Sequence, residues 1–154
     1  MYKNIIFSLA TLSFLGCSST TALKHFENEP TQASAIQDTK KADIIENDKI
    51  KALYWATYLN NIKEAKNDKF LISLYFTYEN KEEYKKISKE NFLLDEKEAI
   101  SIKKIEREKF PFILENRPWG KHYIVSFQPQ KEDFENINLS FTYNSHLLNL
   151  KFQK

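Results

Sequence analysis

The sequence predicts a mostly β protein, an antiparallel sandwich of about seven short strands in two sheets with a short helical crossover, preceded by a disordered tether. Three observations lead to this prediction. Apolar and polar residues alternate with a period of two over several short runs. Asparagine, proline and glycine, which favour turns, separate the runs. The chain also has 12 phenylalanines and 8 tyrosines, enough large side chains for a core without disulfides.

The first 16 residues read as a secretory signal peptide. They begin with a lysine near the amino terminus, continue with an apolar stretch over residues 5–15, and end in the small residue Gly16. A bilayer-spanning helix needs roughly 20 apolar residues, so this stretch is too short to be one. The chain is therefore expected to be exported and cut after Gly16.

Cys17, the only cysteine in the chain, follows the cut. The run Phe14-Leu15-Gly16-Cys17 resembles the bacterial lipobox. The resemblance implies that Cys17 receives a diacylglycerol and an acyl chain such as palmitate, which together hold the protein on a membrane. Ser18 then implies, by similarity to enterobacterial sorting, delivery to the outer membrane. The alternative is an ordinary signal peptide with an incidental cysteine.

Residues 17–48 are predicted to be the lipidated amino terminus and a flexible tether. They are mostly small, polar or charged, contain Pro30 and show no sustained apolar period, so ordering them would bury little surface. A short helix over residues 41–50 is the alternative. The folded domain is expected to cover residues 49–154.

The domain begins with two predicted strands. The first, over residues 53–59, places Leu53, Trp55 and Thr57 on one face. The second covers residues 70–78, and its apolar face is predicted to lie inward. That face comprises Phe70, Ile72, Leu74, Phe76 and Tyr78.

The middle of the domain has less regular patterns. Residues 81–89 suit one or two helical turns that cross between the sheets, and residues 91–94 suit a short strand. A strand over 99–106 is expected to turn Ile100 and Ile102 inward. Residues 117–120 form a predicted turn, because proline at the second position and glycine at the fourth favour type I. A strand over 121–128 follows, with Tyr123, Val125 and Phe127 inward.

The chain ends in a predicted β-hairpin. Alternation is complete over 137–143 and returns over 148–152. Asn144 and Ser145 can form the tight turn, since asparagine tolerates positive φ. Phe76, Phe127 and Phe141 are all expected to lie in the core.

The run Trp119…Tyr123-Ile124-Val125-Ser126-Phe127, with the order of strands, resembles the immunoglobulin-like domains of small campylobacterial outer-membrane lipoproteins. The resemblance covers residues 51–154 in pattern only. In immunoglobulin domains a second core cysteine stands where this chain has Val125. The resemblance implies an immunoglobulin-like sandwich without a disulfide, and it says nothing about activity.

Composition and motifs argue against several functions. The chain has 23 basic and 21 acidic residues, so no excess of positive charge favours nucleic acid. Gly120 is the only glycine after the predicted cut, which excludes a glycine-rich phosphate loop. His25, His122 and His146 have no metal-ligand spacing and read as surface residues. We therefore predict no catalytic residue, no metal, no cofactor and no enzymatic activity.

Aromatic residues are the best candidates for a binding site. If Trp55 faces the core, Tyr54 and Tyr58 lie on an outer surface of a sheet; Tyr75 and Trp119 complete the candidate set. Packing of these rings beneath loops and the tether is the alternative. The sequence thus favours a lipid-anchored, non-enzymatic envelope protein that binds a protein partner of unknown identity, in envelope assembly or surface adhesion. A structural or accessory factor that stabilises an outer-membrane complex is the second hypothesis.

Overall fold

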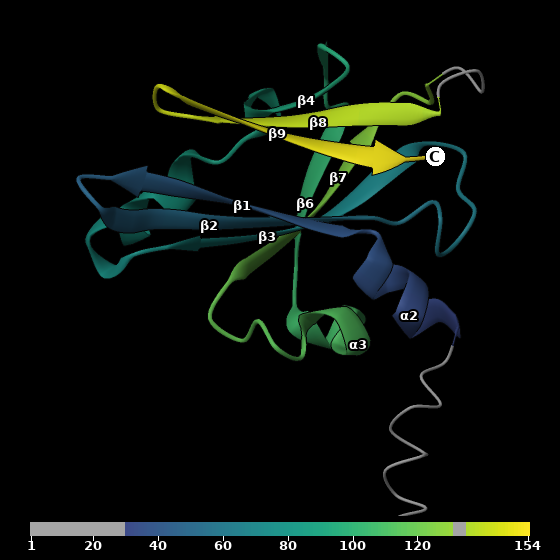
Figure 1. The fold of residues 1–154 in the computed structure, drawn as a ribbon, viewed down its shortest axis with the longest axis horizontal. Coiled ribbons are helices and arrows are strands. Elements are labelled where there is room, and N and C mark those ends of the chain that lie inside the picture. The colour runs from purple at the N-terminus through teal and green to yellow at the C-terminus, as the bar shows by residue number, and fades with distance from the viewer. Residues whose placement is uncertain (1–29, 131–134) are drawn as a thin grey trace, which may run out of the picture.

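The computed structural model describes residues 30–130 and 135–154. The predicted signal peptide, Cys17 and the tether before residue 30 lie outside the described residues. Over the described part of the chain, nine strands form two antiparallel sheets that stack face to face (Figure 1). The predicted mostly β, two-sheet architecture is confirmed, with two strands more than the sequence indicated. The immunoglobulin-like resemblance stays a prediction.

The larger sheet has five strands in the order β1-β2-β3-β7-β6 and the smaller has four in the order β5-β4-β8-β9. Their bounds are β1 Thr39–Glu46, β2 Lys49–Tyr58, β3 Asp68–Phe76, β4 Phe92–Leu94, β5 Lys97–Glu98, β6 Ser101–Ile105, β7 Lys121–Phe127, β8 Asn136–Tyr143 and β9 His146–Gln153. The helices are α2 Pro30–Gln37 and α3 Pro111–Leu114, with 3-10 turns η1 Tyr78–Lys86, η2 Lys89–Asn91 and η3 Arg107–Lys109.

Folded structure begins well before residue 49, so the predicted tether boundary at residue 48 is wrong. Residues 39–46 form the edge strand β1, which pairs with β2 along its whole length. Asn47 and Asp48 connect the two strands with φ angles of 50° and 58°. Two residues with positive φ suit a tight hairpin turn, which also excludes the alternative helix over 41–50. Helix α2 precedes β1 and buries Ala35.

The core lies between the two sheets and is largely aromatic. Phe76, Phe127 and Phe141 are all buried there, as predicted. The rings pack in edge-to-face and stacked contacts, which favour a specific arrangement. Phe70, for example, meets Phe127 with ring centroids 5.8 Å apart and Phe152 at 5.2 Å.

The connections between the sheets follow the prediction with one exception. Helical turns η1 and η2 carry the chain from β3 to β4, and the Tyr84 hydroxyl accepts a hydrogen bond from the Phe76 amide at 2.8 Å. The terminal hairpin of β8 and β9 turns at Asn144, whose φ is 50°. Ile100, predicted to face inward, is exposed because it lies in the crossing between β5 and β6.

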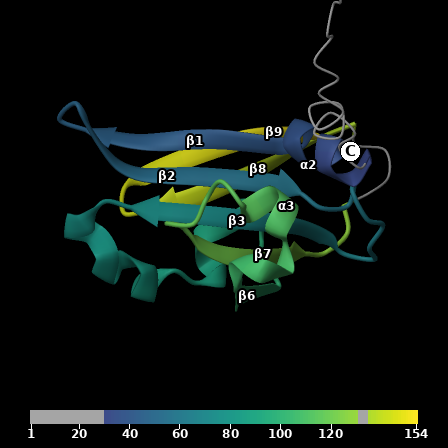
Figure 2. The same cartoon turned by 90° about the horizontal axis from the view of Figure 1, so that it is seen from below.

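Helices α2 and α3 lie together on the outer side of the five-stranded sheet, away from the four-stranded sheet (Figures 1 and 2). Along one edge of the sandwich, the edge strands β1 and β9 pack against each other. The two outer faces therefore differ, since one carries helices and the other does not. The candidate site lies on the face with the helices.

Candidate functional site

A long loop between β6 and β7 covers part of the outer face of the five-stranded sheet. The sequence puts apolar residues on this face too, including Leu71 on β3 and Ile105 on β6, both buried. The loop supplies Leu114 from α3 to cover them, and these three residues form a second small core. Burial of this apolar surface holds the loop on the sheet.

The outer face carries an aromatic cluster of Trp55, Tyr75 and Trp119. Trp55 on β2 lies opposite Ser73 on β3, and Tyr75 follows two residues further along the same face. Trp119 comes from the turn that ends the loop, and its ring centroid is 5.0 Å from that of Trp55 and 5.0 Å from that of Tyr75. Two of the predicted binding residues, Tyr75 and Trp119, are thus brought together, and the sheet adds Trp55.

Two cationic side chains lie over the ring of Trp55. The Lys41 ammonium is 5.6 Å and the Arg117 guanidinium 5.7 Å from its centroid, within range of cation–π attraction. Lys41 also pairs with the Asp43 carboxylate at 3.1 Å. Burial lowers the pKa of Arg117 from its ordinary value, although a guanidinium stays charged at neutral pH. Its buried Nη1 has no hydrogen-bond partner among the described residues.

A groove extends from the cluster between α2 and α3. One end is a hollow of about 340 Å³ that Trp55, Arg117 and Lys41 line with residues of both helices. The other end is a more apolar hollow of about 210 Å³, which Ile62, Lys109 and Phe110 line. Both hollows share Ala35, Phe112 and Ile113. We call this feature the α2–α3 groove.

Exposed apolar side chains surround the α2–α3 groove. Phe112 is 61% exposed, and Ile36 and Trp119 are also exposed. The outer face of the four-stranded sheet is different: its hollow is lined by Asn138, Asn149 and Lys151 among others, with Leu93 and the exposed Leu147 as its apolar residues and no aromatic side chain. Exposed aromatic and apolar groups on one face are typical of interaction surfaces.

Tyr54 and Tyr58 do not lie on this surface, and their predicted outward placement is wrong. They are 0% and 1% exposed and point into the core. Tyr54 stacks on Phe141 with centroids 4.9 Å apart. The predicted sharing of faces was correct but the inward side was reversed. Ala52 and Ala56 alternate with the two tyrosines, and these small apolar residues mark the inward face.

The buried Tyr58 takes part in a polar network at the end of the core. Its hydroxyl donates to the Asp68 carboxylate at 2.6 Å, and Asp68 also accepts from the backbone N–H of Gln130 at 2.7 Å. Burial and the adjacent Asp68 raise the pKa of Tyr58 well above its ordinary value. The Tyr54 hydroxyl, by contrast, has no partner among the described residues.

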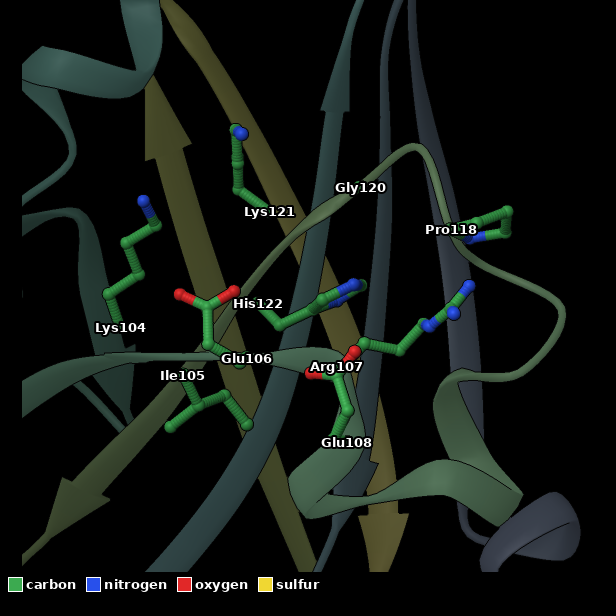
Figure 3. Close-up of a pocket in the computed structure, with 9 residues that line it drawn as sticks. All are labelled: Lys104, Ile105, Glu106, Arg107, Glu108, Pro118, Gly120, Lys121 and His122. Carbon is green, nitrogen blue, oxygen red and sulfur yellow. The ribbon is translucent and has the colours of Figure 1, made fainter.

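Another hollow, of about 350 Å³, lies beside the loop around His122 (Figure 3). It is lined by Lys104, Arg107 and Lys121 together with Glu106. His122 faces outward but is only 4% exposed, so its reading as a surface residue is wrong. The turn that contains Gly120 covers it: a side chain at Gly120 would come within 3.2 Å of the His122 ring.

The hydrogen bonds of the His122 ring are made within the fold, which indicates a structural role. Its Nδ1 lies 3.0 Å from the Ser73 hydroxyl. Burial and the positive charges of Arg117, Lys121 and Arg107 lower the pKa of His122, against a smaller opposite effect of a hydrogen bond with the Arg117 backbone. The neutral imidazole therefore joins the sheet to the turn above it.

Acid is expected to destabilise the protein through His122. Its folded pKa lies below the unfolded value of about 6.5, so the unfolded chain takes up the proton first. The stabilisation is complete above that value and is lost as the pH falls through the folded pKa. We expect His122→Asn to lower Tm by a few degrees at about pH 8, and to reduce the fall in Tm between about pH 8 and pH 5. Calorimetry at constant ionic strength tests this, and parallel pH curves for both proteins would contradict it.

No group of three histidine, cysteine, aspartate or glutamate side chains in residues 30–130 and 135–154 could hold a metal ion. No helix in this part of the chain is long and apolar enough to cross a membrane. Comparison of the chain with protein families, curated proteins and solved structures finds no match.

Proposed function

We propose that this protein is a lipid-anchored, non-enzymatic envelope protein that binds a partner protein through the outer face of its five-stranded sheet. The observation that supports the proposal most is the asymmetry between the two outer faces. One face combines the aromatic cluster, the α2–α3 groove and the exposed Phe112. The hollow on the other face has no aromatic side chain in its lining. Rigid aromatic and arginine side chains beside a hollow are typical of protein–protein hot spots.

The proposed anchor is Cys17, lipidated at the outer membrane. Twelve residues separate it from Pro30, where α2 begins. Even a fully extended chain of that length spans at most about 40 Å. Because α2 borders the groove, this linkage would keep the binding face close to the membrane that holds the acyl chains. A partner in the same membrane is then favoured by high effective concentration.

Affinity capture from native membranes tests this function. We expect wild-type protein to retain a defined partner and Phe112→Ser to lose most of it, because truncation of a hot-spot residue typically costs about 2 kcal/mol or more. Leu147→Ser, an equally exposed apolar residue on the other face, serves as control and should retain the partner. Equal capture by the two variants would contradict the choice of face.

Replacement of the proposed anchor gives a separate test. Cys17→Ala should incorporate no labelled palmitate, and labelling equal to that of the wild type would contradict the anchor.

A further inference from the structure

We infer that the α2–α3 groove binds a peptide segment of its partner that has apolar side chains at its centre and acidic side chains on both sides. The inference rests on the proposed function and adds the chemistry of the partner. It follows from the position of charge along the groove.

The middle of the groove is apolar. Phe112 and Ile113 from α3 line both hollows, and so does Ala35 of α2, which is buried. Its small side chain leaves room for an apolar side chain of the partner against the Phe112 ring. Hollows of this size are large enough to take one or two such side chains.

Positive charge stands at both ends. Lys41 and Arg117 line one end, and Lys109 lines the other. Glu115 is the single acidic residue that lines these two hollows. Lys41 already pairs with the Asp43 carboxylate at 3.1 Å, whereas neither Arg117 nor Lys109 forms an ion pair within the described residues. A carboxylate at each end of a bound segment would meet these cations, and arginine binds carboxylates with two parallel hydrogen bonds.

The two tryptophans of the chain, Trp55 and Trp119, both belong to the aromatic cluster. Their intrinsic fluorescence therefore reports on one end of the groove alone. Probe peptides without tryptophan can be titrated into full-length protein in detergent, with no added label on the protein.

Three synthetic peptides of equal length test the inference. The first has leucine and phenylalanine at its centre and two glutamates at each end; the second replaces the glutamates with glutamine, and the third replaces the apolar pair with serine. We expect the first to change the fluorescence saturably, and the second to bind at least about tenfold more weakly, as loss of charge pairs predicts. The third should not bind. Added salt should weaken the first peptide, because screening reduces attraction between exposed charges.

Variants locate the charges that matter. Arg117→Gln should weaken the first peptide about tenfold or more, and Arg117→Lys, which keeps the charge without the planar fork, should weaken it less. Arg117 is partly buried, so Lys41→Gln provides an exposed second test that should also weaken binding. Leu147→Ser should change nothing.

Several outcomes would overturn the inference. Equal binding of the glutamate and glutamine peptides would remove the role of charge. A response to vesicles of phosphatidylglycerol without a response to any peptide would assign the groove to a lipid surface. A wild-type dimer that Phe112→Ser converts to monomer would assign it to a second copy of this chain. If membrane capture depends on Phe112 but not on Arg117 and the peptides fail, the proposed function stands and this inference falls.

Discussion

Replacing Tyr54 and Tyr58 together with serine is expected to unfold the domain at room temperature. Both rings are buried in the aromatic core, Tyr54 against Phe141 and Tyr58 against Phe70 at 5.0 Å. Removal of one large buried ring typically costs about 3–5 kcal/mol, and two such losses approach the whole stability of a typical domain, about 5–15 kcal/mol. Circular dichroism and urea titration measure the effect. A cooperative transition near the wild-type midpoint would place the tyrosines on the surface.

Single replacements by phenylalanine separate the hydroxyls from the rings. Tyr58→Phe leaves the buried Asp68 carboxylate without one of its donors, which is expected to cost about 1–3 kcal/mol. Tyr54→Phe removes a hydroxyl that has no partner among the described residues, and should be neutral or slightly stabilising. Equal losses of stability in the two variants would contradict the assignment of a hydrogen-bonded hydroxyl to Tyr58 and an unpartnered hydroxyl to Tyr54.

Phe141→Ala is expected to lower the free energy of unfolding by about 3–5 kcal/mol. Phe141 lies in the centre of the four-stranded sheet and contacts three other rings, those of Tyr54, Phe92 and Tyr143. The matched control is Phe112→Ala, the same change at an exposed ring, which should alter stability by no more than about 0.5 kcal/mol. Urea unfolding of both variants is the measurement. A loss below about 1 kcal/mol for Phe141→Ala would mean that this face of β8 does not point into the core.

Much of the fold follows from the alternation of residues. The strands β3, β7, β8 and β9 carry patterns of period two and form close to the predicted ranges, although β3 ends at Phe76 and Tyr78, predicted to continue it, begins η1. Asn144, with its positive φ, forms the predicted hairpin turn. These elements were predictable because one face of each strand packs into the core between the sheets, and large apolar residues at every second position record that face.

Strand β1 was not predicted, because it is an edge strand with a polar outer face. Only Ile44 of its side chains is fully buried, so its alternation is weak. The signal that could have revealed it is the pair Asn47-Asp48 between two runs with isoleucines, since both residue types tolerate the positive φ of a hairpin turn. The paired strand then places α2 beside the site.

The candidate site was only partly predictable. Tyr75 and Trp119 were in the predicted set, but their meeting at Trp55 depends on how the loop between β6 and β7 folds back over the sheet. The spacing of residues in the sequence does not predict that a loop folds back over a sheet. Arg117 and Phe112 lie in the same loop, with no periodicity to distinguish them, so only the three-dimensional arrangement relates them to α2.

We propose that one outer face of the sandwich, and not the other, binds a protein partner. Photo-crosslinking in living cells tests it most directly, with the same photoreactive amino acid placed at residue 112 or at residue 147. The native side chains there are similarly exposed, at 61% and 58%, but lie on opposite faces. We expect one defined crosslinked protein from residue 112 and none from residue 147. Crosslinks from residue 147 alone, or an identical product from both positions, would contradict it.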